Sequence, residues 1–453
     1  MQIHHKKMSI FLATLVTAAL IALLSTLTAA GDDPEESAPV EVYSPFGLFS
    51  PGTLGALPTS ASRTILDTLG FDTIGEYQDY SLGLTKEIGV SWVRMDFEYD
   101  GWHFTDPADY LDKLQANGIE VVGCVLPINP FVPANLDSFK DNFRHLIRRY
   151  PWIKVWQIGN EPDLSWDNPE DYPRFFFAGQ QVVRERCPDC KVALAGAGAR
   201  WPEQNFGEWR QSLAIYDRIV STIADEARGD PKPFDIVDMH YYDFSGTGEG
   251  MLETLREYRD LPRKYGLSRD IEFWVTESAT PTGPLTWPPD SPSQTEEQQA
   301  GELVARFVTM LGAQVKRVSW ARFYENYRYQ DLEGGFFDHA GLIYNGLGSE
   351  ADEGIRAGTK KQGFYAYKTL VSKLGGCVRV HRLGAGHYKF FFDSGRQPVY
   401  VLWDAGGSTP PEELSGPIVV TDLQGVRTET LGELLTLGPI PVFVEKQQPV
   451  VES

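Results

Sequence analysis

Short apolar segments alternate with amphipathic segments along most of the chain, from about residue 45 to residue 375. Strands that alternate with helices favour a parallel sheet, and eight such units favour a closed (β/α)8 barrel of the TIM type, an α/β fold. Amphipathic helical patterns occupy most of the segments between the apolar runs. The predicted strands cover residues 46–49, 90–96, 119–126, 154–159, 192–196, 234–240, 272–277 and 317–324.

A doubly wound open sheet is the alternative fold. Such sheets usually have fewer units, and a glycine-rich phosphate loop follows their first strand. The only similar feature here is Gly196-Ala197-Gly198, which lacks a third glycine and follows the fifth predicted strand. The pattern therefore favours the barrel, over residues 43–375.

The pattern changes after Gly375. Short runs of alternating apolar and polar residues, separated by Gly and Pro, continue to about residue 446. This pattern predicts a small C-terminal β-sandwich over 376–446, followed by a tail at 447–453.

The first residues are typical of an export signal. A positively charged start at residues 4–7 precedes an apolar run over 8–30, and small residues at 28–30 provide a cleavage site. The apolar run is also long enough to remain as an N-terminal membrane anchor. We expect residues 1–30 to be a signal peptide or anchor, residues 31–42 to be a disordered linker, and the protein to be secreted or held in the cell envelope.

The net charge of −21 argues against nucleic acid as a partner, because an acidic protein repels phosphate backbones. It argues equally against anionic membrane surfaces, so we expect no membrane partner beyond the N-terminal anchor. The simplest reading of the charge is that it keeps the protein soluble.

The cysteine pair Cys187-Pro-Asp-Cys190 has the spacing of a redox or zinc motif. A zinc site needs a second pair of ligands, and the sequence offers none. In an oxidising compartment, a small loop disulfide is the favoured interpretation. Cys124 lies in a predicted strand, and we interpret it as an inert apolar residue.

Two glutamates each end a strongly apolar strand. Glu161 follows the fourth strand in Trp156-Gln157-Ile158-Gly159-Asn160-Glu161, and Glu277 ends the seventh in Trp274-Val275-Thr276-Glu277. A single Glu on a protein surface is weak evidence for a catalytic role. These two, however, lie at the ends of strands that face each other across the mouth of a barrel. Two carboxylates that flank one bond are the requirement of glycoside hydrolysis.

Asn160-Glu161-Pro162 and Thr276-Glu277 resemble the signatures of the large (β/α)8-barrel clan of retaining glycoside hydrolases. This clan includes cellulases, mannanases, β-glucosidases, β-xylosidases and arabinofuranosidases. The resemblance covers residues 45–375, and the predicted β-sandwich resembles that of β-xylosidase-like members. It implies that Glu161 is the acid/base and Glu277 the nucleophile. Many members have Trp where Gly159 stands, whereas arabinofuranosidase-like and glucuronidase-like members have Gly, so the family stays open.

The resemblance implies roles for five further residues. Arg94 would contact the nucleophile and keep it ionised, and Asn160 would bind the 2-hydroxyl of the sugar. His240-Tyr241-Tyr242 resembles the His-x-Tyr of the clan, in which the hydroxyl of Tyr242 would donate a hydrogen bond to the nucleophile, and we expect His240 to belong to the substrate-binding residues with the other four. Trp320 on the eighth strand would be the sugar platform, although Tyr324 competes for that role. Structural roles are the alternative: a barrel salt bridge for Arg94 and a satisfied core residue for His240.

We therefore expect a glycosidase that acts on carbohydrate by double displacement, without a metal or an organic cofactor. Retention requires the two carboxyl groups to lie about 5–5.5 Å apart, whereas a separation of about 9 Å belongs to inverting enzymes. A transglycosylase that uses the same residues and an inactive carbohydrate-binding protein are the alternatives. The sequence does not indicate the sugar or the linkage.

Overall fold

The computed structural model describes residues 44–49, 66, 71–128, 135–164, 166, 168–200, 208–242, 249–283, 285, 293–325, 335–346, 354–393, 395–404 and 406–447. The predicted signal or anchor, the linker to residue 42 and residues 448–453 of the tail lie outside these residues. Within them, no helix combines the length and the hydropathy that a membrane crossing requires. The described residues all belong to one compact unit, Val42–Ser453.

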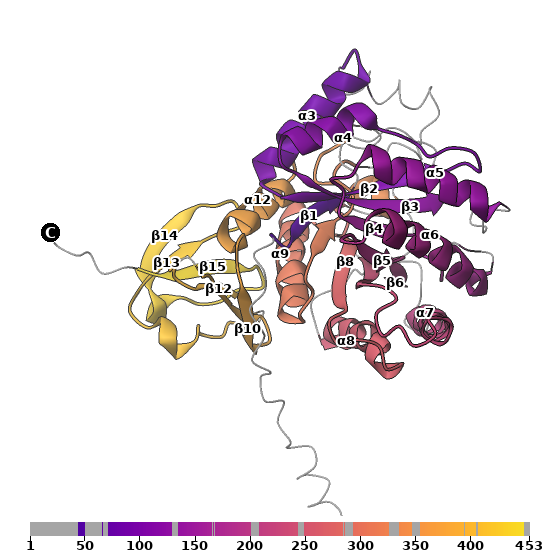
Figure 1. Ribbon diagram of the computed structural model, residues 1–453. Coiled ribbons are helices and arrows are strands. Elements are labelled where there is room, and N and C mark those ends of the chain that lie inside the picture. The colour runs from indigo at the N-terminus through magenta and orange to yellow at the C-terminus, as the bar shows by residue number, and fades with distance from the viewer. Residues whose placement is uncertain are drawn as a thin grey trace, which may run out of the picture. The chain divides into compact units, whose positions relative to one another are not determined.

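The parallel strands form a barrel (Figure 1). The sheet order is β5-β4-β3-β2-β1-β9-β8-β7-β6, and a pairing between β5 and β7 closes it. Because β5 and β6 are two pieces of one interrupted strand, the nine segments make the eight predicted strands, and the predicted (β/α)8 fold is confirmed. The segments are β1 (Phe46–Phe49), β2 (Trp92–Tyr99), β3 (Glu120–Pro127), β4 (Val155–Ile158), β5 (Lys191–Leu194), β6 (Ala197–Arg200), β7 (Ile236–Tyr242), β8 (Glu272–Ala279) and β9 (Val318–Trp320).

Helices surround the barrel (Figure 1). Their ends carry local signals: Thr73 caps α3 through the N–H of Glu76, Gly89 ends that helix with φ 87°, and Thr295 and Gln298 form a capping box that starts α9. The helices are α3 (Ile74–Ile88), α4 (Ala108–Ala116), α5 (Leu136–Arg149), α6 (Tyr172–Arg186), α7 (Glu208–Glu226), α8 (Glu249–Lys264), α9 (Glu296–Gly312), the short α10 (Phe336–His339) and α12 (Gln362–Leu374).

The barrel interior is apolar at one level and polar at the next. An apolar cluster fills the first level, and the inward positions two residues further along four of these strands are polar. Because buried polar groups are costly without partners, these residues bond to one another. The apolar cluster is Trp92, Val122, Val155, Ala193, Ile236 and Trp274. The polar residues are Arg94, Gln157, Asp238 and Thr276, all buried.

A β-bulge interrupts the alternation of β8. Asp238 of β7 pairs with Trp274 of β8, and His240 pairs with Glu277. Between the two pairs β7 advances by two residues and β8 by three. Regular alternation would send Thr276 and Glu277 to opposite faces of the sheet. Instead Thr276 bonds to Asp238 and Glu277 bonds to Arg94, so both side chains face the barrel interior. The extra residue therefore turns Glu277 toward the mouth of the barrel.

The C-terminal strands form one antiparallel sheet in the order β10-β11-β12-β15-β13-β14. Successive residues of β12 face two different cores: Val399 and Val401 join the core of the barrel, whereas Tyr400 and Leu402 join a smaller core of this domain. The expected β domain after the barrel is thus confirmed. Its strands are β10 (Arg379–Gly384), β11 (His387–Phe391), β12 (Val399–Leu402), β13 (Pro417–Thr421), β14 (Arg427–Leu431) and β15 (Val442–Lys446).

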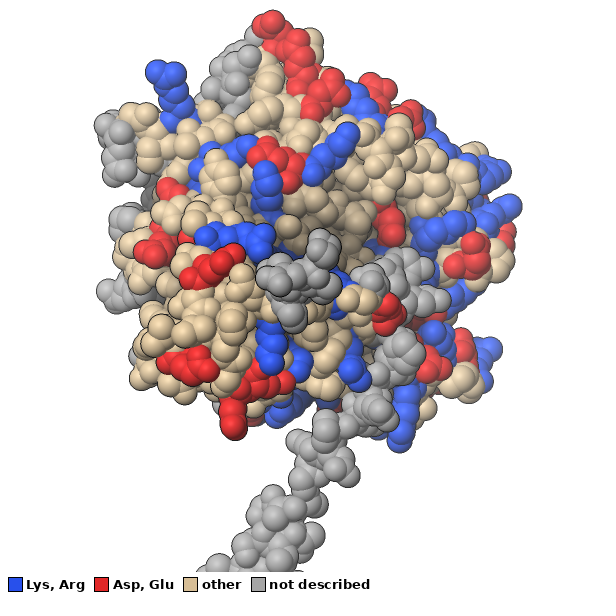
Figure 2. Space-filling view, turned by 90° about the vertical axis from the view of Figure 1, so that its left-hand side faces the viewer, with Lys and Arg blue, Asp and Glu red and all other residues tan. Residues whose placement is uncertain are grey.

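Basic and acidic side chains are interspersed on the face of the molecule shown in Figure 2. Ion pairs among the described residues include that of Lys389 with Glu413, at 2.7 Å. On this face the excess negative charge of the chain is not gathered into one continuous patch.

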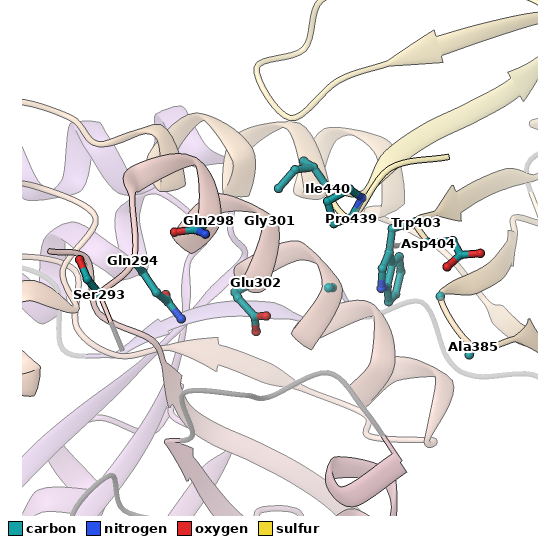
Figure 3. Close-up of a pocket in the computed structure, with 12 residues that line it drawn as sticks. Ser293, Gln294, Gln298, Gly301, Glu302, Ala385, Trp403, Asp404, Pro439 and Ile440 are labelled. Carbon is teal, nitrogen blue, oxygen red and sulfur yellow. The ribbon is translucent and has the colours of Figure 1, made fainter. Parts of the chain in front are cut away.

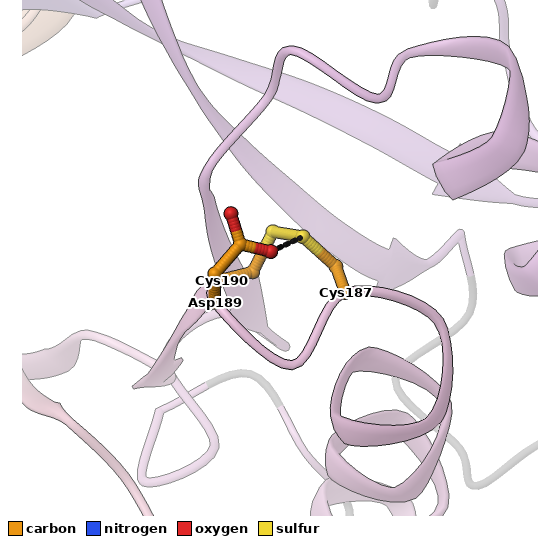
Figure 4. Close-up of side chains that lie close together, drawn as sticks. All are labelled: Cys187, Asp189 and Cys190. Atoms are coloured by element: carbon orange, nitrogen blue, oxygen red, sulfur yellow. Dashed lines mark hydrogen bonds between the residues drawn. A yellow bond between two sulfur atoms is a disulfide. The ribbon is translucent and has the colours of Figure 1, made fainter.

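Cys187 and Cys190 are joined by a disulfide across the turn between α6 and β5, with their Cα atoms 5.2 Å apart (Figure 4). The predicted loop disulfide is therefore confirmed. Asp189 of the same turn pairs with Lys154 at 3.0 Å. Because disulfide sulfurs are not thiolates, this turn is not a zinc site in the oxidised protein.

The interruption between β5 and β6 brings the backbone at Gly196 against the polar level of the barrel. A Cβ atom on Gly196 would lie 2.1 Å from Nε2 of His240 and 2.7 Å from Oδ2 of Asp238. No side chain fits there without moving His240. This close approach explains a glycine at this position.

We predict that Gly196→Ala lowers the free energy of unfolding by about 1–3 kcal/mol, because the added methyl group overpacks a buried site. Gly83→Ala in α3 is the control, since a Cβ atom there meets nothing within 4 Å. It should leave stability unchanged or raise it by about 0.5–1 kcal/mol. Urea unfolding of both variants measures the difference, and equal stabilities would contradict the proposed contact.

Candidate active site

Six of the seven residues singled out in the sequence meet at the C-terminal ends of the barrel strands. They come from β2, β7, β8 and the segment after β4, which is where barrel enzymes build their sites. All are buried except the half-buried Asn160. The six residues are Arg94, Asn160, Glu161, His240, Tyr242 and Glu277.

Both carboxylate oxygens of Glu277 accept hydrogen bonds. Nη1 of Arg94 donates to Oε1, and the hydroxyl of Tyr242 donates to Oε2. Burial alone would raise the pKa of Glu277, but the charges of His240 and Arg94 and the bond from Tyr242 outweigh it and hold the pKa below its usual value. Glu277 is therefore ionised at neutral pH.

The Arg94 guanidinium is fully buried and bonds in several directions. Nη2 donates to Oδ1 of Asn160 at 2.6 Å, and Nε donates to Oε1 of Gln157 at 2.7 Å. Gln157 in turn donates to Oδ2 of Asp238 at 2.6 Å. These bonds fix the orientation of the guanidinium beneath the mouth of the barrel.

The backbone around Glu161 is irregular. Glu161 has φ 39°, a left-handed conformation that non-glycine residues rarely adopt and that costs on the order of 1–3 kcal/mol. Its N–H donates to the carbonyl of Gly196 at 3.0 Å. Gly159 has φ 88°, and a Cβ atom on it would lie 2.9 Å from Tyr172, so this turn favours glycine where many clan members have tryptophan.

His240 lies between three carboxylates. Nδ1 is 2.7 Å from Oε1 of Glu161, and Nε2 is 3.5 Å from Oε1 of Glu277 and 3.6 Å from Oδ2 of Asp238. Burial lowers the pKa of His240, but the Glu277 charge and the hydrogen bonds to Asp238 and Glu161 overcome this and raise it to about 10. The imidazole is therefore protonated at neutral pH and donates from both nitrogens.

Glu161, His240 and Glu277 each place one nitrogen or oxygen atom within 4.8 Å of the others, a spacing that a metal ion could bridge. Nδ1 of His240 already bonds to Oε1 of Glu161 at 2.7 Å. Each oxygen of Glu277 also has a hydrogen-bond donor, Arg94 for Oε1 and Tyr242 for Oε2. This donor set therefore fits two hydrogen-bonded carboxylates better than it fits a cation.

The network contains polar residues that the sequence analysis did not select. Gln157 and Asp238 link Arg94 to the far side of the barrel, and Thr276 donates to both oxygens of Asp238. A polar residue at an inward position of an otherwise apolar strand was the available signal. Cys124 is buried, and burial raises the pKa of its thiol, which agrees with the interpretation of an inert residue. It borders this network, because its thiol donates to the carbonyl of Gly159 at 3.4 Å and Nη2 of Arg94 lies 3.1 Å from its sulfur.

Two further acids lie beside the site. Asp96, two positions after Arg94, has Oδ1 3.6 Å from the guanidinium, and burial raises its pKa. Asp163 accepts from the N–H of Gly198 and the hydroxyl of Ser212, and burial raises its pKa to about 6. Regular alternation after Arg94 would have identified Asp96, whereas nothing in the sequence marks Asp163.

A third cation also approaches the site. The Arg322 guanidinium lies 5.0 Å from the ring of Phe337 and 6.0 Å from that of Phe49, and its charge helps to lower the pKa of Glu277. Arg322 lies two residues after the end of β9 and inside the strand predicted at 317–324, so its place near the end of a barrel strand was the available sequence signal.

Trp320 is the exception among the seven residues. Its side chain is fully buried, its ring contacts Phe307 of α9 edge to face, and its indole N–H donates to the carbonyl of Ala340 at 3.0 Å. A ring enclosed in this way has no face for a ligand, so the structure does not support the expected sugar platform. Tyr324 is also buried, where it bonds to Ser81.

Comparisons with known proteins support the fold. No protein-family model matches the chain, and no curated protein matches it. Among solved structures, a family 39 glycoside hydrolase from Bacteroides cellulosilyticus WH2 is similar with a TM-score of 0.58 and 16% identity, over 89% of this chain and 81% of that one. A glucosidase from Croceicoccus marinus is similar with a TM-score of 0.57 and 14% identity, over 82% of this chain and 92% of that one.

A family 51 α-L-arabinofuranosidase from Bifidobacterium longum is also similar, with a TM-score of 0.55 and 15% identity, over 91% of this chain and 98% of that one. At such identities the similarity concerns the fold. It extends over most of each chain, so these comparisons agree with the barrel fold described above.

Proposed function

We propose that the protein is a retaining O-glycoside hydrolase with Glu277 as nucleophile and Glu161 as acid/base. The observation that carries the proposal is an ionised, buried Glu277 that lies opposite Glu161, with a pair of their oxygens within 4.8 Å. This upper bound on the distance between two oxygens agrees with the separation of about 5–5.5 Å between the carboxyl groups of retaining enzymes. The three similar structures are described as glycosidases, which agrees with hydrolysis of a glycosidic bond.

In the first step, an oxygen of Glu277 attacks the anomeric carbon while the bond from that carbon to the leaving oxygen breaks. The leaving oxygen takes a proton from Glu161, and the sugar is left as an ester on Glu277. Arg94 and Tyr242 keep Glu277 charged and oriented before attack, and the charge they stabilise falls as the ester forms. Protonated His240 donates to Glu161 at 2.7 Å, so Nδ1 of His240 passes its proton to Glu161 as Glu161 protonates the leaving oxygen, and the proton that Glu161 takes from water in the second step restores the pair.

In the second step, a water attacks the same carbon and gives its proton to Glu161. The ester bond breaks, Glu277 regains its charge, and the sugar leaves with its original configuration. Asn160, held by Arg94 through its Oδ1, turns its amide toward the hydroxyl next to the anomeric carbon. The substrate class is therefore carbohydrate.

We also propose that the protein works outside the cytoplasm. The disulfide between Cys187 and Cys190 supports this location, because such bonds persist in oxidising compartments. The predicted export signal agrees with it.

We expect the full-length protein to hydrolyse at least one substrate in a panel of aryl glycosides, and Glu277→Gly to abolish turnover. Azide should restore turnover of that variant with inverted product, because a small anion can occupy the space of the lost carboxylate. Glu161→Gln should slow substrates with poor leaving groups by about 10²–10⁴-fold. Glu272→Gln, on the same strand as Glu277 but at its opposite end, is the control.

Proton NMR of the first-formed sugar measures the stereochemical outcome of this reaction. Retained configuration is expected from the wild-type protein. Inverted product from the wild-type protein, or full activity in Glu277→Gly, would refute the proposal.

Tyr242→Phe removes one hydrogen bond to the Glu277 carboxylate and leaves the ring in place. The pKa of Glu277 should rise, so the acidic limb of the pH profile of kcat/KM should move to higher pH. The maximum of kcat/KM should fall about 10- to 100-fold, as expected for a hydrogen bond to a charged group. Tyr367→Phe, whose buried hydroxyl donates to Gly47 instead, should leave the profile unchanged.

The raised pKa of His240 predicts a pH-dependent stability. The folded protein holds a proton on His240 up to about pH 10, whereas the unfolded chain loses it near pH 6.5. The stabilisation is therefore complete below about pH 6.5 and disappears as the pH rises toward 10. Between pH 6.5 and pH 10, the free energy of unfolding of the wild-type protein, measured with urea, should fall by on the order of a few kcal/mol more than that of His240→Asn. Parallel curves would contradict the charge assigned to His240.

A further inference from the structure

A cleft of about 580 Å³ lies between α9 and the C-terminal β domain (Figure 3). Its volume is typical of sites that hold small ligands. The wall from the barrel is the segment at 293–294 with the first half of α9, and the opposite wall consists of turns at 385–386, 403–404 and 439–440. This cleft is separate from the site around Glu277 and has no part in the mechanism above.

The two walls are held together by buried contacts. The ring of Tyr388 in β11 packs against Gly312, and its hydroxyl bonds to Oγ1 of Thr309 at 3.4 Å. Ile440 lies 3.1 Å from the position of a Cβ atom on Gly301, and Lys373 of α12 pairs with Glu445 of β15. The cleft is therefore a formed feature with fixed walls.

The lining combines hydrogen-bonding groups with an aromatic ring. Glu302 and Asp404 supply carboxylates, and Gln294 and Gln298 supply amides. Asp404 is held in one orientation because it accepts from the N–H groups of Gly406 and Ser408 at 2.7 and 3.2 Å. Trp403 is half-buried and stacks on Tyr388 at 5.5 Å between ring centres, so the structure fixes its ring at the edge of the cleft.

These groups select the charge of a ligand. None of the described residues that line the cleft is Lys, Arg or His, and Glu302 pairs with the buried Arg306 behind the lining at 3.7 Å. A phosphate, sulfate or uronate would therefore meet two carboxylates and no cationic group on the lining itself. Carboxylates accept bonds from hydroxyl groups, amides donate to oxygens, and an indole ring packs against the C–H face of a sugar ring. A neutral saccharide has this combination of groups.

The cleft also connects to the proposed catalytic strand. Gln294 accepts bonds from the N–H of Gly283 at 2.6 Å and the hydroxyl of Thr280 at 3.0 Å, and both donors follow Glu277 on the segment that leaves β8. Because α9 begins directly after that segment, its first half lies at the same end of the barrel as the mouth.

We propose that the cleft is an accessory binding site for neutral saccharides, which holds one part of a long carbohydrate chain while another part lies at the barrel mouth. The inference rests on the proposed function and names its substrate class as neutral oligo- or polysaccharide. Engaging one chain at two places raises the apparent affinity for long substrates without a new contact at the catalytic residues.

Calorimetry on the full-length Glu277→Gln variant tests binding without turnover. The probes are cellohexaose, xylohexaose and mannohexaose as neutral chains and hexagalacturonate as an anionic one. At least one neutral chain should bind, and adding Trp403→Ala should weaken it about tenfold. Adding Glu302→Gln, which keeps the shape of the side chain and guards against misfolding, should also weaken it. Binding of no neutral chain, or unchanged affinity in both variants, would overturn the proposal.

Kinetics separate this proposal from the proposed function. In the otherwise wild-type protein, Trp403→Ala should lower kcat/KM on the polysaccharide and leave kcat/KM on an aryl monosaccharide unchanged. Trp152→Ala, at the opposite end of the barrel, should change neither. Equal losses on both substrates would refute an accessory site. A wild-type protein without hydrolytic activity would refute the proposed function alone, because calorimetry still decides whether the cleft binds saccharide.

Discussion

The contact between Arg94 and Glu277 is the interaction on which the rest of the site depends. A fully buried guanidinium is costly unless it has an anionic partner and further acceptors. Glu277 supplies the charge, and Asn160 and Gln157 accept the remaining bonds. Removing either charged partner would leave the other buried and uncompensated, so the pair ties the stability of the barrel to the ionisation of its proposed nucleophile.

The hydrogen bonds of Arg94 extend across the barrel as one connected network. Gln157 accepts from Arg94 and donates to Asp238. Asp238 also accepts from Thr276 and lies 3.6 Å from His240. His240 then reaches Glu161 at 2.7 Å, so the two proposed catalytic carboxylates belong to the same chain of contacts. Because each member is held by its neighbours, the charges are oriented before a substrate arrives, and this preorganisation is the main source of electrostatic catalysis.

The sequence predicted what depends on local pattern. The eight strands followed from apolar runs, and Glu161 and Glu277 followed from their places at strand ends. Alternation could not predict the bulge in β8 that turns Glu277 inward, because a bulge depends on the pairing of two strands. Trp320 was misjudged for a related reason: its side chain faces α9, and its exposure is set by tertiary packing that a motif does not describe.

Both proposed catalytic residues occupy positions where regular strand geometry fails. Glu161 has a left-handed backbone conformation, and Glu277 follows a bulge. Such departures cost free energy, and they persist only where the surrounding structure over-determines them. The apolar cluster around Trp92 and Trp274 lies just beneath these residues and provides a rigid base. Because Gly196 has no side chain, its backbone can lie against His240, and its carbonyl accepts a hydrogen bond from the N–H of Glu161. The barrel thus places these two irregularities at the same end, and it is there that its buried charged side chains meet.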